Sequence, residues 1–192
     1  MDGLILSSSP NTDGLTAACV EAVKSGFSDA DRTIREVRLT DAGVGSCRQC
    51  NDGWGTCRTD GVCQVEDGFQ SVHDEVRAAE ALIVVTPVYW GDLSESAKCF
   101  TDRLRRCEAT RGDGSRLSGR WFMGVAAAGG GGGGTVSCLG QMDRLLGHMR
   151  MKRWDLVGLS RWTREAKLDA IRTSARALAG TLPEQEGHDG ME

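Results

Sequence analysis

Four cysteines lie within seventeen consecutive residues of this chain, in the sequence CRQCNDGWGTCRTDGVC. Their spacing is C-x2-C-x6-C-x5-C, and they are Cys47, Cys50, Cys57 and Cys63. Thiolates at such intervals can converge on one zinc ion or on an iron–sulfur cluster. The same residues could instead form a disulfide clasp, or a loop that is only rich in cysteine. The choice depends on the compartment and on the elements that surround the segment.

The composition narrows the class of protein. The chain has 192 residues, 40% of them hydrophobic, which is enough for one domain with a substantial core. The formal net charge is only -4 with both signs interspersed, which argues against nucleic acid or an anionic membrane as a partner. No basic leader precedes the first apolar run, and no stretch reaches the roughly 18 apolar residues of a membrane-spanning helix. We therefore expect a cytoplasmic protein, whose reduced thiols serve as ligands or redox groups rather than as disulfides.

Strands and helices are predicted to alternate along the chain. Apolar runs predict strands at 4–6, 33–39, 81–87, 121–129 and 153–159. Helical patterns fall between and after them, at 15–26, 68–79, 94–107, 135–149 and 163–179. This alternation predicts an α/β fold with a doubly wound, five-stranded parallel sheet, because parallel strands need covered crossovers. We expect a single domain at 1–180 with a cysteine-rich insertion at about 43–66, between the second strand and the second helix, and a polar, disordered tail at 181–192.

Three loops are expected to meet at one edge of this sheet, where open parallel sheets bind ligands. SSSPNTDGLT at 7–16 places hydroxyl groups beside the free amides of a helix start, which suits a phosphate. TPVYWGDLSES at 86–96 offers a stiff turn and two aromatic rings, and AAAGGGGGG at 126–134 lets backbone amides approach a ligand. Each loop also has a simpler interpretation: a capped turn, local aromatic packing, or a flexible linker.

The order of these loops resembles the NADPH-dependent FMN reductase group of flavodoxin-like proteins, especially its iron-sulfur flavoprotein branch. LILSSSPNTDGLTAA resembles the group's phosphate loop, and ALIVVTPVYWGDLSESAKCFTDRLRR resembles its central strand and flavin loop. The resemblance implies a flavodoxin-like sheet that binds FMN. By position it assigns to the phosphate Ser9, Asn11, Leu15 and Thr16, and to the ribityl chain and ring Pro87, Val88, Tyr89, Trp90, Gly91, Gly129 and Gly130. The group often has a basic residue in place of Asn11 and an asparagine in place of Leu15.

The resemblance also implies a reaction. NAD(P)H would pass a hydride to FMN, and the flavin would pass electrons to a small-molecule or protein acceptor that the sequence does not identify. A bound flavin carries this chemistry itself, so no catalytic side chain is expected. Members of the group commonly form dimers or tetramers, so we expect a homodimer or a homotetramer.

The cysteine segment departs from the branch that it resembles. Iron-sulfur flavoproteins have C-x2-C-x2-C in this region and a fourth cysteine four to seven residues later, whereas NDGWGT widens the middle gap of this chain to six. A four-iron, four-sulfur cluster, metal-free thiols and a zinc ion all stay open, in that order. The leading function is therefore an FMN-dependent oxidoreductase. The alternatives are an iron-sulfur electron carrier and a zinc-stabilised binding or thiol-sensing module.

The helix after the flavin loop has a clear apolar face. Four residues recur at helical spacing and are expected to be buried: Ala97, Phe100, Leu104 and Cys107. The charged residues between them are expected to point mostly outward: Asp102, Arg103, Arg105 and Arg106. The cysteines outside the segment are expected to be small, buried apolar residues: Cys19, Cys99, Cys107 and Cys138.

Overall fold

The computed structural model describes residues 1–183, apart from the side chains of residues 112 and 113. Within these residues, five strands form one parallel sheet in the order β2-β1-β3-β4-β5. The strands are β1 (Gly3–Ser7), β2 (Ile34–Arg38), β3 (Ala81–Pro87), β4 (Trp121–Ala128) and β5 (Lys152–Ser160). This order is that of doubly wound, flavodoxin-like sheets, so the predicted fold class is confirmed.

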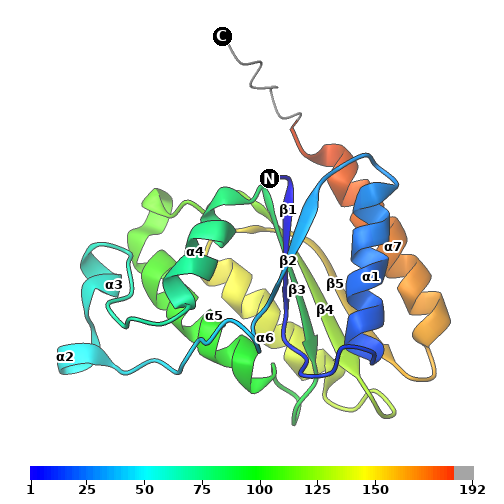
Figure 1. Cartoon of the computed structure of the whole chain (residues 1–192), viewed down its shortest axis with the longest axis horizontal. Coiled ribbons are helices and arrows are strands. Elements are labelled where there is room, and N and C mark those ends of the chain that lie inside the picture. Colours follow the sequence, from blue (N-terminus) through cyan, green and yellow to red (C-terminus); the bar gives the residue numbers. More distant parts are fainter. Residues whose placement is uncertain (184–192) are drawn as a thin grey trace.

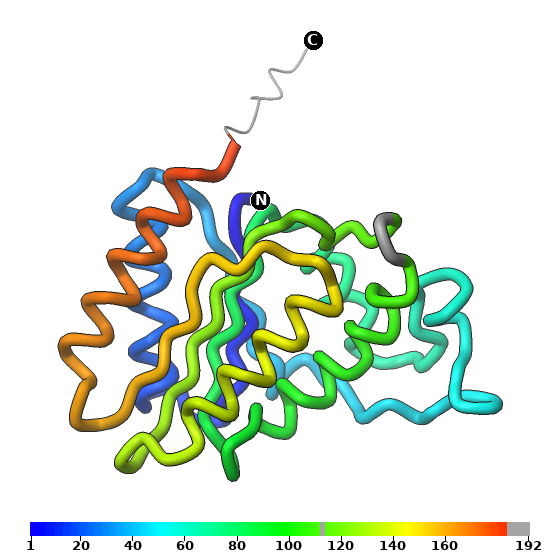
Figure 2. The backbone as a smooth tube through the Cα atoms, turned by 180° about the vertical axis from the view of Figure 1, so that it is seen from behind, coloured from blue at the N-terminus to red at the C-terminus, as the bar shows by residue number. Residues whose placement is uncertain are grey.

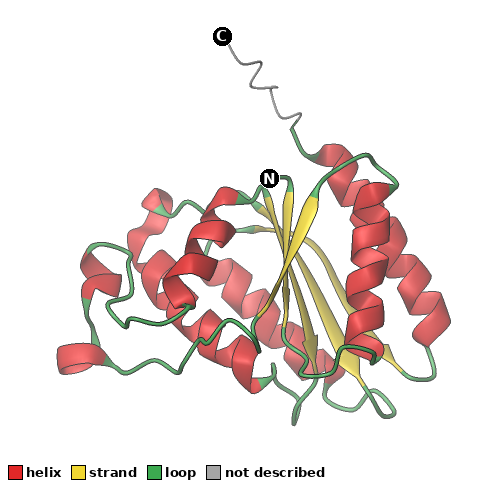
Figure 3. Cartoon of the chain, viewed as in Figure 1, coloured by secondary structure: helices red, strands yellow, loops and turns green. Residues whose placement is uncertain are grey.

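Helices cover both faces of the sheet, as Figures 1 and 3 show. One face carries α1 (Leu15–Ser28) and α7 (Arg164–Thr181), which pack against each other. The other face carries α4 (Phe69–Ala78), α5 (Glu95–Glu108) and α6 (Thr135–His148). Three short elements lie on the α5 side: α2 (Cys50–Gly53), α3 (Thr56–Thr59) and the 3-10 helix η1 (Ala109–Gly114). In the part of the chain that the structure describes, no helix is long and apolar enough to cross a membrane.

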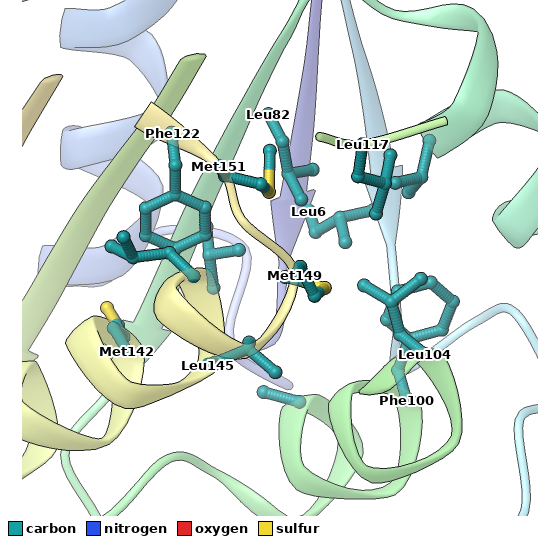
Figure 4. Packing of buried hydrophobic residues seen from close by; sticks show 14 of the residues in the cluster. Leu6, Leu82, Phe100, Leu104, Leu117, Phe122, Met142, Leu145, Met149 and Met151 are labelled. Carbon is teal, nitrogen blue, oxygen red and sulfur yellow. The ribbon is translucent and has the colours of Figure 1, made fainter. Parts of the chain in front are cut away.

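Strand β3 is the centre of the sheet because it pairs with both β1 and β4. Its residues alternate between two cores, as the twofold repeat of a strand requires. Leu82 and Val84 belong to the core beneath α4, α5 and α6, whereas Ile83 and Val85 belong to the core beneath α1 and α7. Figure 4 shows the first core, in which Leu82 lies near Leu6 and Met151, with side chains of α5 and α6 below them in the view. Burial on both faces explains the unbroken apolar run of this strand.

The carboxyl ends of all five strands lie at one edge of the sheet, the lower edge in Figures 1 and 2. The loops after β1, β3 and β4 therefore meet there. At the opposite end, α7 continues to Thr181, and Leu182 packs into the core with 4% of its surface exposed. The rest of the predicted tail, residues 184–192, lies outside the described residues.

One prediction for α5 is wrong: Arg103 is only 1% exposed and does not point outward. Both carboxylate oxygens of Asp67 accept hydrogen bonds from its guanidinium, at 2.6 and 2.9 Å, and this pairing permits burial of the charge. Arg103 follows Phe100 by three residues and precedes Cys107 by four, so the helical repeat places all three on neighbouring positions. The residues predicted to be buried are all 0% exposed: Ala97, Phe100, Leu104 and Cys107.

Candidate functional site

The loops after β1 and β3 are tied together at the carboxyl edge. The carbonyl oxygen of Ser8 accepts hydrogen bonds from Ser94 Oγ at 3.1 Å and from Ser96 Oγ at 3.2 Å. The amide of Ser94 donates to Thr86 Oγ1 at 3.1 Å. Ser8, Thr86 and Ser94 are at most 2% exposed, so these bonds are shielded from water. The first two predicted ligand loops therefore form one connected surface.

The loops after β3 and β4 are joined as closely. The amide of Val88 donates to the carbonyl of Ala127 at 3.0 Å, and Ser137 Oγ donates to the carbonyl of Gly91 at 2.8 Å. Gly91 and Gly134 lie almost in contact, since a Cβ added to Gly134 would be 2.6 Å from the Cα of Gly91. Gly134 also has a φ of 79°, which side chains rarely adopt. Glycine is thus required where the third loop meets the second.

The VYWGDL segment forms a tight turn that displays its aromatic residues. Tyr89 and Asp92 exchange two backbone hydrogen bonds, at 3.0 and 2.9 Å, across the turn residues Trp90 and Gly91. Both turn residues have positive φ, 51° and 81°, as two-residue hairpin turns of this handedness require. Trp90 is fully exposed and Tyr89 is 44% exposed. The turn therefore offers a flat apolar surface to solvent at the sheet edge.

The start of α1 is open to an anion. The helix begins at Leu15 after Gly14, with no side-chain cap and no acidic residue in its first turn. Its first amides therefore lack the side-chain partner that a capped helix has. Ser9 Oγ accepts a hydrogen bond from the amide of Asn11 at 3.2 Å, and Thr16 is 5% exposed. Free amides and nearby hydroxyl groups at a helix N-terminus are suited to a phosphate.

The glycine tract forms an open shelf beside the turn. No atom would lie within 4 Å of a Cβ added to Gly129 or Gly130, so these positions face open space. Trp162, which follows β5, lies over Gly131, where an added Cβ would be 2.9 Å from its ring. Sequence reasoning missed Trp162, although an aromatic residue directly after a strand of this sheet is a signal that could have found it. It is 73% exposed and extends the apolar surface of the edge.

The predicted FMN residues occupy two places along this edge. One group surrounds the α1 N-terminus: Ser9, Asn11, Leu15 and Thr16. The other lies at the turn and the glycine shelf: Pro87, Val88, Tyr89, Trp90, Gly91, Gly129 and Gly130. A cavity of about 870 Å³ adjoins the turn, and only Val88, Tyr89 and Trp90 of these residues line it. Free amides, a flat aromatic turn and an unobstructed glycine shelf fit the phosphate and the ring of FMN.

The cysteine segment lies apart from this edge. In Figure 1, α2 and α3 project beyond α4 and α5, away from the sheet. The four clustered cysteines line one small cavity of about 20 Å³, together with a fifth, Cys107 of α5. Arg103 and Arg106 of α5 line the same cavity. Sequence reasoning assigned Cys107 to the core alone, and only the fold brings it to the segment. Of the other dispersed cysteines, Cys19 and Cys138 are buried as predicted and Cys99 is half-buried.

Arg103 anchors both ends of the cysteine segment. Besides its two bonds to Asp67, its guanidinium donates to the carbonyl of Gly45 at 3.0 Å and to Cys63 Sγ at 3.2 Å. It also lies over the ring of Phe69, 4.3 Å from the centroid. Burial alone would raise the pKa of Asp67, but hydrogen bonds from Arg103 and from two backbone amides outweigh it and lower the pKa to about 2. This ion pair, fully buried at Arg103 and partly exposed at Asp67, thus joins α5 to both ends of the segment.

Arg106 anchors the middle of the segment. Its guanidinium donates a hydrogen bond to the carbonyl of Gly53 and stacks on the ring of Trp54, 4.0 Å from the centroid. Arg58 lies over the same ring at 5.7 Å. The half-buried Trp54 therefore contacts two cationic side chains, one from the segment itself and one from α5.

The thiols do not form an assembled metal site in this arrangement. Among the side chains that the structure describes, no three from His, Cys, Asp or Glu come together closely enough to hold a metal ion. The cavity among the cysteines has room for about one water molecule. The donor set is chemically suited to iron or zinc, but this geometry does not fit a four-iron cluster unless the segment opens.

A buried carboxylate supports the far side of the segment. Glu108 is 0% exposed and accepts hydrogen bonds from Arg77 Nε at 2.7 Å and Ser115 Oγ at 2.6 Å, while His73 Nε2 lies 2.6 Å from its Oε1. Arg77 also donates to the carbonyl of Gly61 at 2.8 Å. Burial would raise the pKa of Glu108, but the bonds from His73, Ser115 and Arg77 outweigh it and lower the pKa to about 2.

Comparison with known proteins identifies the family. A family model described as NADPH-dependent FMN reductase matches residues 1–155. The chain belongs to this family. Among curated relatives, the iron-sulfur flavoprotein of Methanosarcina thermophila is 28% identical over 99 residues, covering 50% of this chain and 48% of that protein. The iron-sulfur flavoprotein of Archaeoglobus fulgidus is 27% identical over 145 residues, covering 74% of this chain and 56% of that protein. The matches to such relatives thus span about half of their length.

Solved structures from this family's fold are similar throughout the chain. The NAD(P)H:quinone oxidoreductase from Methanothermobacter marburgensis superposes with a TM-score of 0.72 at 20% identity, covering 100% of this chain and 99% of that one. An FMN-dependent NADH-azoreductase from Bacillus anthracis, solved in complex with FMN, has a TM-score of 0.72 at 14% identity, covering 93% and 100%. At these identities the similarity establishes the flavodoxin-like fold.

Proposed function

We propose that this member of the family is an FMN-dependent oxidoreductase that takes a hydride from NAD(P)H and passes electrons to a second acceptor. The observation that carries the proposal is the connected carboxyl edge. An uncapped helix start, an aromatic turn and a glycine shelf are joined there by the bonds of Ser8, Ser94 and Gly91. An anion site and a flat apolar site on one rigid edge match a ligand that carries both a phosphate and a ring system.

The residues of this edge would bind and orient the cofactor. Ser9, Thr16 and the amide of Leu15 would hold the phosphate with hydrogen bonds, with Asn11 beside them. The segment from Pro87 to Gly91 would contact the ribityl chain and the ring, and Gly129 and Gly130 would leave space for the ring's far side. A bound flavin supplies the hydride and electron chemistry. No side chain of this chain is therefore assigned a catalytic role.

Reconstitution with FMN tests the proposal. The purified protein should bind FMN with one-to-one stoichiometry, followed by quenching of flavin fluorescence. Anaerobic addition of NADPH or NADH should then bleach the visible absorbance of the flavin, because the reduced ring no longer absorbs there. Thr16→Val, which keeps the shape of the side chain and removes its hydroxyl, should weaken FMN binding by about tenfold, the typical effect of one hydrogen bond to a charged group. A protein that binds no FMN under these conditions would refute the proposed function.

A second candidate is an iron-sulfur electron carrier. The donor set of five thiols favours it, as does the name of the curated relatives, iron-sulfur flavoprotein, and it requires the segment to rearrange around the cluster. Anaerobic purification followed by assays for iron, acid-labile sulfide and zinc decides among the three states of the segment. About four irons and four sulfides per chain would support the carrier. Zinc alone would support a structural or thiol-sensing role, and neither metal would support free thiols. Cys50→Ser and Cys57→Ser should lower any metal content.

Self-association completes the proposal. We infer a homodimer or homotetramer, because the fully exposed Trp90, the 85% exposed Val136 and the 73% exposed Trp162 leave apolar surface around the carboxyl edge. Sedimentation velocity should give the mass of two or four chains. A monomer at tens of micromolar would contradict this part of the proposal and leave the FMN assignment to its own test.

A further inference from the structure

A second groove lies outside the residues assigned to FMN. It runs between α5 and α6 and has a volume of about 190 Å³. Figure 2 shows these two helices side by side, on the face opposite to α1 and α7. Its lining, called here the α5–α6 groove, consists of Asp92, Leu93, Lys98, Thr101, Asp102, Arg105, Gln141, Arg144, Leu145 and His148.

The α5–α6 groove adjoins the cavity beside the aromatic turn. Leu93 and Lys98 line both hollows. From Lys98 to Arg105 the axis of α5 rises roughly 10 Å, because each residue of a helix adds about 1.5 Å. A ligand that places one ring at the turn can therefore reach the far end of the groove only if it is long.

The floor and walls of the groove differ in polarity. Leu93, Leu145 and Thr101 are at most 8% exposed and form its floor. The walls carry charges from both helices, which makes the groove a polar channel over an apolar base. Such a combination suits a ligand with both apolar and ionic parts.

Two guanidinium groups of the groove have no partner of their own. Among the described residues, Arg105 and Arg144 make no side-chain hydrogen bond or ion pair. The other charged side chains nearby already have partners. Lys98 forms an ion pair with Asp102, and Asp92 Oδ1 accepts a hydrogen bond from the amide of Leu93 at 2.7 Å. His148 lies at the last residue of α6 beside them. Two unpaired arginines that face one groove from different helices are suited to a phosphate, which guanidinium binds in a bidentate manner.

We propose that Arg105 and Arg144 are the residues that bind the 2′-phosphate of NADPH, the donor named in the family's description, and so distinguish NADPH from NADH. The inference rests on the proposed function, because it places the nicotinamide end of the donor at the flavin edge. The two ends of the dinucleotide match the two hollows. The flat nicotinamide ring would lie in the cavity beside the aromatic turn, and the 2′-phosphate dianion would lie in the groove between Arg105 and Arg144. NADH lacks that dianion and leaves both guanidinium groups unpaired.

Donor specificity tests the inference. The ratio of kcat/KM for NADPH to that for NADH is measured for the wild type and for Arg105→Ala, Arg144→Ala and the double variant. Each single substitution should lower this ratio by about tenfold, and the double variant by up to about a hundredfold, since hydrogen bonds to charged groups contribute ~1.5–3 kcal/mol each. Arg176→Ala, an exposed arginine on α7 at the opposite face, is the matched control and should leave the ratio unchanged.

A binding measurement separates this inference from the proposed function. Calorimetric titration with 2′,5′-ADP and with 5′-AMP reports on the groove even in protein without flavin. Tighter binding of 2′,5′-ADP, lost in the double variant and retained in Arg176→Ala, is expected. Equal binding of the two nucleotides, or a double variant with an unchanged NADPH-to-NADH ratio, overturns the inference. A double variant impaired only with a protein acceptor would assign the groove to an acidic partner instead and overturn it as well. Absence of FMN binding would refute the proposed function alone.

Discussion

The carboxyl edge and the cysteine segment are held in place by different kinds of interaction. At the edge, small residues connect the loops. The hydroxyl groups of Ser94 and Ser137 donate hydrogen bonds to backbone carbonyls, and Gly91 packs on Gly134. In the cysteine segment, two long cationic side chains, Arg103 and Arg106, reach across from α5. The edge is thus held by short side chains and by backbone contacts between its loops, whereas the segment depends on two long side chains from one helix. Single substitutions should therefore disrupt the two regions through different mechanisms.

Arg103→Ala should have the largest effect. It leaves the Asp67 carboxylate without its bidentate partner and frees Gly45 and Cys63, so stability should fall by ~3–5 kcal/mol, the usual result of breaking a buried ion pair. The free energy of unfolding in urea measures this loss. Arg105→Ala, two positions along the same helix and without an ion pair among the described residues, is the control and should change stability by less than about 0.5 kcal/mol. Equal effects of the two substitutions would show that Arg103 does not anchor the segment.

Acid should weaken the cysteine side through Glu108. Its pKa is lowered from an ordinary value of 4.5 to about 2, so the stability it contributes is present above about pH 4.5 and is lost as the pH falls toward 2. A shift of that size corresponds to about 3 kcal/mol. Urea unfolding of the wild type between pH 5 and pH 2.5 should show a steeper loss than unfolding of Glu108→Gln, which has no carboxylate to protonate. Parallel pH profiles for the two proteins would exclude Glu108 as the source.

The contrast between the two regions also explains how far the sequence could predict them. Strand β3 was predictable because burial on both faces leaves an unbroken apolar run, and the position of the three loops follows from the parallel sheet. The burial of Arg103 was not predictable, because a charged residue is expected outside unless its partner is known. That partner, Asp67, lies 36 residues earlier in the chain. Local periodicity carries no information about such a pair.

The same limit applies to the residues that join each site from elsewhere. Cys107 reaches the cysteine cavity from α5, and Trp162 reaches the glycine shelf from the loop after β5. Each looked ordinary in its own helix or loop, and only the packing of distant elements gives it a place in a site. Motif spacing could identify the four clustered cysteines. It could not show that, in this structure, no three of them are close enough together to hold a metal ion.

Gly134→Ala tests whether the edge depends on backbone contact. The new Cβ would lie 2.6 Å from the Cα of Gly91 and would require a φ of 79°, so stability should fall by ~1–3 kcal/mol and FMN binding should weaken with it. Gly133→Ala is the matched control, because no atom lies within 4 Å of its added Cβ. Thermal unfolding and FMN titration of both variants measure the two effects. If Gly133→Ala were as harmful as Gly134→Ala, general stiffening of the tract rather than the Gly91 contact would be the cause.

Trp90→Ala should have the smallest effect on the fold and a selective effect on the ligand. The side chain is fully exposed, so its removal creates no cavity. The positive φ of this position is equally unfavourable for alanine, which also has a Cβ, so the substitution does not change the backbone strain. Loss of an aromatic stacking partner should weaken FMN binding by about 2- to 13-fold, corresponding to ~0.5–1.5 kcal/mol. Fluorescence titration gives the affinity, and an unchanged melting temperature shows that the fold is intact. An unchanged FMN affinity would mean that the ring contacts lie elsewhere on the edge, with Tyr89 or the Trp162 shelf as the next positions to vary.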